Sequence, residues 1–235
     1  MTNMTQTLGT VVQNWTTRPR PSKIVLQGNL CTLEPLNGEK HAKDLFESFK
    51  EAGDEFWTYI PIGPFDRLDD YRALVDKLSV SDDAHFAIIN KEKGRAVGQL
   101  CLMRCDPANG VVEVGFVLFS PHLWKTTMAT EAHYLPMKYV FEDLGYRRYE
   151  WKCNSHNGPS RKAAYRLGFQ FEGTFRQAEV VKGRNRDTQW FSIIDKEWID
   201  CRSAFDRWLS GENFEDGKQK LALSEIRSKI LADKD

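Results

Sequence analysis

The chain has 235 residues, a length that suits one substantial hydrophobic core with ragged ends. Lysine plus arginine equals aspartate plus glutamate, at 33 each, so no global field exists to hold nucleic acid or an anionic membrane. The five cysteines are scattered, with no CxxC pair and no histidine at metal-ligand spacing. This pattern argues against a disulfide framework and against a zinc site, so no metal is expected.

The same cysteine usage predicts a reducing, cytoplasmic compartment. No apolar run approaches the ~20 residues that span a bilayer, and the N-terminal region lacks the apolar core of a secretory signal. We therefore expect a soluble protein without a membrane partner.

The predicted elements follow one another in a regular order. Residues 1–22 are polar and end in Pro19 and Pro21, so they predict a poorly ordered or surface-laid arm, which Trp15 could pin down. Apolar positions at helical spacing predict helices at 39–52, 67–80, 133–145, 160–168 and 199–209. Apolar runs beside turn signals predict strands or hairpins at 23–36, 85–103, 111–119, 146–154, 171–181 and 188–195.

This order predicts one mixed α/β domain. The polar residues after the last helix predict a weakly ordered tail. A strand that leads into a helix, followed by a second such pair, places both helix starts at the carboxyl ends of neighbouring strands, where α/β sheets bind ligands.

The first of these strand-to-helix turns, 119–132, reads FSPHLWKTTMATEA. The first N–H groups of a helix are unpaired and the helix dipole favours negative charge there, so such a turn can hold phosphate. Phosphate-binding turns usually contain glycine, because the backbone must approach the ligand closely. This turn contains none, and its threonines could equally serve only to cap the helix.

Four short stretches occur in a characteristic order: LEPL at 33–36, EVGF at 113–116, ATEA at 129–132 and NGPSRKAAYRLGFQFEG at 157–173. Together they resemble the GNAT acetyltransferases, in particular the RimJ/RimL-like branch of protein N-terminal acetyltransferases. The resemblance implies a mixed, mostly antiparallel sheet with central splayed parallel strands and helices on both faces. It also implies acetyl-coenzyme A as cosubstrate and direct attack by an amine in a ternary complex.

The resemblance implies that the turn wraps the pyrophosphate of acetyl-coenzyme A. Trp124, Thr127 and Ala129 occupy the three key places of the family pattern. Thr127 stands where a glycine is expected, so the turn must keep ordinary helical or extended angles at this residue. Lys125 stands where this branch often has another glycine. The predicted cofactor contacts are Val117, Phe119, Lys125, Thr126, Thr127, Met128, Ala129, Thr130, Asn157, Ser160, Arg161 and Lys162.

Within that set, Asn157 matches the family position that contacts the pantetheine arm. Ser160 looks like the N-cap of the following helix. Arg161, Lys162 and Arg166 are candidates for the 3′-phosphate, with solvated helix-surface cations as the alternative. The oxyanion donor that the resemblance implies is a backbone amide of the strand that contains Val117 and Phe119, at a bulge.

Glu113 is the predicted general base, because an apolar setting would raise the pKa of a carboxylate on this strand. A carboxylate paired at the rim of the sheet is an equally good interpretation. His156 and Glu172 are lesser candidates for the base. Many members of the family have a tyrosine as acid where Ala164 stands here, and Tyr165, one step along the helix, takes its place in the prediction. The alternative is a water, or no acid at all, because a thiolate leaves readily.

The acceptor side that the resemblance implies is the aromatic segment Phe56, Trp57 and Tyr59, although clustered aromatics are more often core. The hairpin tip KGRNRD, at 182–187, would favour acceptors with a carboxylate or phosphate if it overhangs the slot. The helix with Phe205, Trp208 and Leu209 could cover its own sheet or a second copy in a homodimer.

Two functions remain open from the sequence. The first is acetyl-coenzyme A-dependent N-acetyl transfer to a primary amine, either a peptide N-terminus or a small amine. The second is a non-catalytic acyl-coenzyme A-binding or protein-interaction module on the same scaffold. In either case the predicted organisation is an arm at 1–22, the acetyltransferase domain at 23–200 and a C-terminal helix with a polar tail at 201–235.

Overall fold

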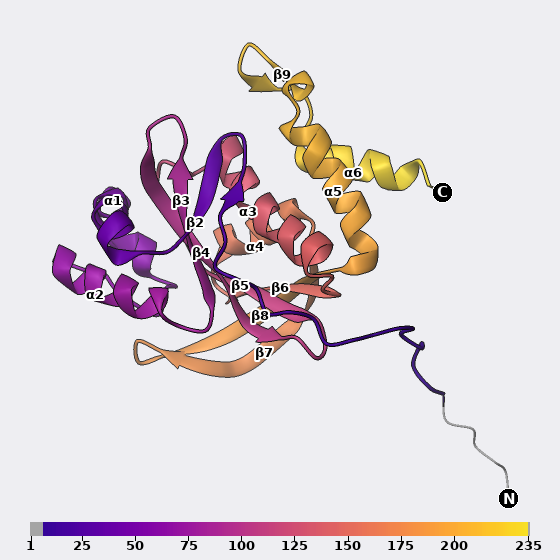
Figure 1. Ribbon diagram of the computed structural model, residues 1–235, viewed down its shortest axis with the longest axis horizontal. Coiled ribbons are helices and arrows are strands. Elements are labelled where there is room, and N and C mark those ends of the chain that lie inside the picture. Colours follow the sequence, from indigo (N-terminus) through magenta and orange to yellow (C-terminus); the bar gives the residue numbers. More distant parts are fainter. Residues whose placement is uncertain (1–6, 235) are drawn as a thin grey trace, which may run out of the picture.

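The computed structural model describes residues 7–234, and its centre is an eight-stranded sheet with the strand order β1-β2-β3-β4-β5-β6-β8-β7 (Figure 1). Only β5 and β6 pair in parallel among these strands, and every other neighbouring pair is antiparallel. The strands are Leu26–Gln27 (β1), Cys31–Pro35 (β2), Ala84–Asn90 (β3), Arg95–Asp106 (β4), Val111–Phe119 (β5), Arg148–Asn154 (β6), Gln170–Val181 (β7) and Arg184–Ile194 (β8).

Helices cover both faces of this sheet, as Figure 1 shows. The two helices α1 (Gly38–Lys50) and α2 (Leu68–Ser79), with the short 3-10 turn η1 (Asp54–Trp57) between them, bury one hydrophobic cluster. The other face packs against α3 (Thr127–Lys138), a π-helical turn η2 (Tyr139–Asp143), α4 (Gly158–Leu167) and α5 (Asp195–Leu209). The predicted mixed sheet with helices on both faces is confirmed.

The parallel pair separates partway along its length. Register between β5 and β6 runs only from Val111 to Val114 on β5, and the rest of β5 leaves its neighbour. On the other side, β4 pairs Gln99 with Leu118 and Cys101 with Gly115, so β5 carries one extra residue there. Phe116 takes a positive φ of 53° within this bulge. A bulge bends its strand, and it explains the predicted splay.

The N-terminal arm lies along the molecule beside the β4–β5 turn. The indole N–H of Trp15 donates to the carbonyl of Ala108 at 2.8 Å, and Arg18 lies over the same indole ring. Trp15 therefore pins the arm as predicted. Residues 1–6 lie outside the described range, and the division at residues 22 and 200 stays a prediction.

The C-terminal residues differ from the predicted weakly ordered tail. After α5, the chain forms the 3-10 turn η3 (Gly211–Asn213), a small hairpin of β9 (Phe214–Glu215) and β10 (Lys218–Gln219), and the helix α6 (Leu223–Ala232). Leu223, Ile226 and Ile230 of α6 are buried in the main core. Their spacing of three and four residues is an apolar helix stripe, which a reading of composition alone overlooks. No helix within residues 7–234 is long and apolar enough to cross a membrane.

Candidate functional site

The separation of β5 from β6 opens a pocket between the two strands. We call it the slot. Its wall includes the bulge of β5, the start of α4 and the segment that follows η1. Of the residues that the sequence singled out, those that line the slot are Tyr59, Glu113, Val117, Asn157, Ser160 and Arg186. The structure thus brings a carboxylate, strand backbone and a helix start to one cavity.

In the glycine-free turn before α3, one residue adopts the left-handed backbone conformation, and it is not a threonine. Lys125 takes the positive φ of 58°, and no such angle occurs at Thr126 or Thr127. Thr126 is extended and Thr127 begins the helix. Thr127 therefore keeps an ordinary backbone conformation, as its β-branched side chain requires. Lys125, which stands at a second glycine position of the family, adopts the left-handed conformation instead.

Thr126 caps α3 through its side chain. Its Oγ1 accepts from the N–H of Ala129 at 3.2 Å and donates to the carbonyl of Leu123 at 2.9 Å. The capping alternative is thus correct for the Thr126 hydroxyl, which is already occupied. The remaining first-turn donors of α3 are the N–H groups of Thr127 and Met128, which have no partner within a helix.

The predicted cofactor contact of Thr130 stays a prediction that its surroundings disfavour. Thr130 is buried, and its Oγ1 accepts a hydrogen bond from Arg166 at 3.0 Å. This contact ties α3 to α4. It also gives Arg166 a partner inside the fold, in place of the predicted 3′-phosphate.

The strand residues Val117 and Phe119 differ in their surroundings. Val117 belongs to the bulge and lines the slot, whereas Phe119 pairs with Gly98 of β4. The carbonyl of Phe119 accepts from the indole N–H of Trp124 at 2.6 Å, so this key turn residue holds the strand end. The bulge backbone beside Val117 is therefore the part of β5 that faces the slot.

The start of α4 lies three residues earlier than predicted. Asn157, not Ser160, is the N-cap, and its Oδ1 accepts from the N–H of Ser160 at 3.1 Å. Ser160 instead accepts from the indole of Trp151 at 3.0 Å. The helix starts early because Pro159 fits its first turn, where no N–H is needed. The cofactor roles of Arg161, which is half-buried, and of exposed Lys162 stay predictions.

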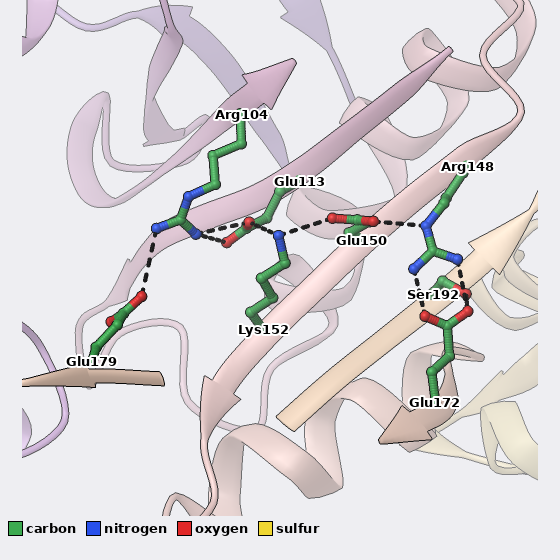
Figure 2. Close-up of polar contacts among 8 residues, drawn as sticks. All are labelled: Arg104, Glu113, Arg148, Glu150, Lys152, Glu172, Glu179 and Ser192. Atoms are coloured by element: carbon green, nitrogen blue, oxygen red, sulfur yellow. Dashed lines mark hydrogen bonds and ion pairs between the residues drawn. The ribbon is translucent and has the colours of Figure 1, made fainter. Parts of the chain in front are cut away.

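Glu113 does not have the predicted apolar surroundings. Its carboxylate is buried, and Arg104 Nη1 lies 2.9 Å from both oxygens (Figure 2). Lys152 Nζ lies 2.7 Å from Oε2. The alternative of a paired carboxylate is therefore correct for its contacts.

Ion pairs continue from Glu113 toward Glu172, so that residues of β4, β5, β6 and β7 form a row of alternating charges (Figure 2). We call this row the charge chain. Parallel register places Glu113 beside Glu150, and Lys152 Nζ lies between them, 2.9 Å from Glu150. Arg148 then joins Glu150, at 2.7 Å, to Glu172, at 2.6 Å. Hydrogen bonds from Arg148 hold the pKa of Glu172 below its usual range, which disfavours Glu172 as a base.

Tyr165, the predicted acid, lies outside the slot. Its half-exposed ring packs edge-on against Phe191 at 5.4 Å, and it is not among the lining residues. Ala164, at the family's tyrosine position, is fully buried. The rotation of one residue along the helix therefore places the phenol outside the slot, and the acid role of Tyr165 stays a prediction that this geometry disfavours. His156 is exposed and also does not line the slot.

The aromatic segment divides between core and slot. Phe56 stacks on Phe49 at 5.5 Å, and Trp57 is buried, so both belong to the packing of α1 and α2. Tyr59 alone of the three lines the slot. Sequence composition could not separate these roles, because all three side chains have the same chemistry.

The β7–β8 hairpin reaches this same segment. Lys182 Nζ donates to the carbonyl of Trp57 at 3.0 Å, and Arg186 from the same hairpin lines the slot. Arg186 pairs with Glu179 at 3.2 Å. Of these cations, Arg186 already pairs with a carboxylate, whereas Lys182 bonds to a backbone carbonyl. That the hairpin tip overhangs an acceptor stays a prediction.

Two buried residues of α3 were not recognised from the sequence. Glu131 accepts backbone N–H bonds from Asn29, Leu30 and Cys31 at 2.7, 2.7 and 2.8 Å and so fixes the β1–β2 turn. His133 stacks on Phe119, at 4.8 Å between ring centroids, behind the slot. Burial lowers the pKa of His133 to about 3, so the ring is neutral at physiological pH.

Comparison with known proteins gives consistent matches. Residues 31–170 match the family model described as an acetyltransferase (GNAT) domain. An uncharacterised N-acetyltransferase of Bacillus licheniformis is 34% identical over 148 residues, which are 61% of this chain and 83% of that protein. The ribosomal-protein-serine acetyltransferase of Escherichia coli is 28% identical over 102 residues, or 43% of this chain and 56% of that protein.

Among solved structures, the crystal structure of a GCN5-related N-acetyltransferase from Brucella melitensis superposes with a TM-score of 0.89. It is 46% identical, and the match covers 92% of this chain and all of that one. The structural match is therefore longer than residues 31–170, the part of the chain that the family model covers.

Proposed function

Because the chain belongs to the GNAT acetyltransferase family and is an acyltransferase, we propose that it transfers acetyl from acetyl-coenzyme A to a primary amine in the slot. The observation that carries this proposal is the bulge at Phe116, which frees β5 backbone beside a cavity. The neutral amine nitrogen attacks the thioester carbon, the C–N bond forms and the C–S bond breaks. The nitrogen loses one proton, and the leaving thiolate takes up one, directly or through water. A bulge N–H near Val117 would stabilise the oxyanion.

The pyrophosphate would bind at the first turn of α3. The N–H groups of Thr127 and Met128 are donors there, and the helix dipole favours an anion. The left-handed angle at Lys125 turns the chain sharply just before the helix, and the exposed ammonium adds a nearby cation. A threonine hydroxyl is not needed for this binding mode.

The acceptor would enter between Tyr59 and the β7–β8 hairpin. We propose a peptide N-terminus, as in the RimJ/RimL-like branch, or a small amine. The match to a ribosomal-protein acetyltransferase supports the peptide, although the cavity itself does not distinguish the two.

An acetylation assay with a panel of acceptors tests this proposal. Release of free coenzyme A is followed for small primary amines, for peptides with a free N-terminus and for the same peptides with a blocked one. We expect mass spectrometry to locate one added acetyl group on the amine of the turned-over acceptor. Turnover that is equal for free and blocked acceptors would contradict amine acetylation.

The second candidate, a non-catalytic module, has its own support. Glu131 and Asn157 have structural tasks, so their presence does not by itself require a bound cosubstrate. Tyr165 also lies outside the slot. Acetyl-coenzyme A binding without turnover of any free amine in the panel would favour this module.

The role of Glu113 can be separated by Glu113→Gln. If Glu113 is the base, the variant should keep its stability and its affinity for acetyl-coenzyme A but lose the low-pH limb of its rate profile. If Glu113 only balances Arg104 and Lys152, removal of its charge leaves buried cations poorly compensated. The variant should then unfold at lower urea concentration, with an unaltered pH profile in the folded fraction.

A further inference from the structure

Three side chains of types that bind metals lie close together where β3 begins beside β4. None of them belongs to the charge chain. Asp83, His85 and Cys101 each offer a ligand atom, and these atoms lie within 4.8 Å of one another. His85 and Cys101 are direct cross-strand partners, so their side chains share one face of the sheet. Asp83 precedes His85 by two residues and lies on the same side.

The histidine in this group lacks a partner that its burial demands. His85 is 4% exposed, and within residues 7–234 its buried Nδ1 has no hydrogen-bond partner. A buried polar group without a partner destabilises the folded state, so a partner for this nitrogen would be favourable. A metal ion bound to the imidazole would use a ring nitrogen as ligand in place of a hydrogen bond.

We propose that Asp83, His85 and Cys101 bind one Zn²⁺ ion. Carboxylate, neutral imidazole and thiolate are all common zinc ligands, and the two anionic donors match the charge of the ion. On binding, the Cys101 thiol releases its proton to solvent and the thiolate forms the bond to zinc. Three protein ligands leave a fourth position for water.

The surroundings of the three side chains suit a buried site that an ion can enter from one side. Cys101 is fully buried, whereas Asp83 is partly exposed and provides the side from which an ion enters. Two cations near the group oppose the ion: Arg104, which interacts with Asp83, and Lys23, whose Nζ is held by the carbonyls of Ser79 and Ser81 at 2.7 and 2.6 Å. This repulsion lowers affinity, so we expect binding weaker than that of a four-ligand zinc finger.

The position of the group suggests what the ion does. The ring of Phe116, the bulge residue, packs edge-on against His85 at 5.5 Å between centroids. Gly115, its neighbour in the bulge, is the cross-strand partner of Cys101. Zinc would therefore fasten β3 and β4 directly behind the bulge that opens the slot. This role is structural, and it does not depend on acetyl transfer.

Titration of the metal-free protein with Co²⁺ tests the proposal, because Co²⁺ substitutes for zinc and reports its ligands by absorption. A thiolate ligand gives a near-ultraviolet charge-transfer band. We expect this band to saturate at one equivalent, to disappear on addition of Zn²⁺, and to be absent in Cys101→Ser. The matched control is Cys31→Ser, an equally buried cysteine on neighbouring β2, which should keep the band.

A second variant protects the test from misfolding. Asp83→Asn, at a partly exposed position, should fold and keep the thiolate band, but should require at least about tenfold more Co²⁺ to saturate it. Zinc should also raise the melting temperature of the wild type more than that of Asp83→Asn. A folded wild type without the band, a band that persists in folded Cys101→Ser, or equal affinity in Asp83→Asn would overturn the site.

Discussion

At the residue scale, the carboxylate of Glu131 is the clearest case of a side chain whose task is structural. It is buried and accepts three backbone N–H bonds from the β1–β2 turn. A Cβ at Gly28 would lie 2.5 Å from this carboxylate, so the turn closes over it without room to spare. A residue of the ATEA motif can therefore stabilise the fold without contacting the cosubstrate.

This leads to the first prediction. Glu131→Gln removes the negative charge from three charge-assisted hydrogen bonds and leaves at least one buried N–H poorly paired, which costs about 3 kcal/mol of unfolding free energy. Urea unfolding should show this loss, while the affinity of the folded protein for acetyl-coenzyme A stays unchanged. A stable variant that cannot bind acetyl-coenzyme A would instead make Glu131 part of the site.

The second prediction concerns pH. Burial places the folded-state pKa of His133 at about 3, below the unfolded value of about 6.5, so the unfolded chain binds more protons as the pH falls. The contribution of a neutral His133 is complete above pH ~6.5 and is lost progressively toward pH ~3. From pH 7 to 5 this amounts to about 2 kcal/mol. Urea unfolding of His133→Leu should show a flatter decline than the wild type, and an identical slope would contradict the assignment.

Several residue roles could not be predicted from the sequence. Glu113 was placed correctly on its strand, but the cations that pair with it come from β4 and β6, which lie at different distances along the chain. The grouping of Asp83, His85 and Cys101 was not predicted for the same reason. Residues that meet across two strands show no characteristic spacing in the sequence. Tyr165 stands one helix position beyond the family's tyrosine, and one position rotates a side chain by ~100°.

At the element scale, the β7–β8 hairpin is held against the end of the slot that Tyr59 lines. Its turn residues Lys182 and Gly183 both have positive φ, 50° and 72°, which is the geometry of a tight hairpin turn. Lys182 then reaches the carbonyl of Trp57. This single contact connects the hairpin to the segment that precedes Tyr59.

Lys182→Asn is the third prediction. Asparagine tolerates the left-handed conformation but is too short to reach the Trp57 carbonyl. The freed hairpin should raise the KM for the acceptor by roughly three- to tenfold and leave the Kd of acetyl-coenzyme A unchanged. Arg184→Ala, an exposed change in the same hairpin, is the control and should have no effect. A rise in KM in both variants would point to a general charge effect.

Elements were easier to predict than their contacts. The order of strands and helices from β2 to α5 was confirmed, because periodic apolar runs and turn signals such as Lys93-Gly94 are local. The bulge and splay came from the family resemblance. The positive φ at Lys125 did not follow from either source, since lysine has no preference for that conformation.

At the scale of the whole molecule, the C-terminal helices complete the core. α6 buries three aliphatic side chains, and Arg227 donates to the carbonyls of Tyr165 and Arg166 at the end of α4. The fourth prediction is that Ile226→Ala lowers the unfolding free energy by about 2–4 kcal/mol, as truncation of a buried isoleucine does. Exposed Lys229→Ala is the control. Equal urea midpoints for the two variants would show that α6 does not belong to the folding unit.

The central claim is that the glycine-free turn before α3 binds the pyrophosphate of acetyl-coenzyme A through backbone N–H groups. Calorimetric titration of the wild type, Thr127→Gln and Thr127→Glu tests it, because the two variants differ in charge at almost equal size. We expect roughly micromolar binding by the wild type, a similar Kd for Thr127→Gln and at least about 100-fold weaker binding for Thr127→Glu. Equal affinities for the two folded variants would contradict the claim and place the pyrophosphate elsewhere.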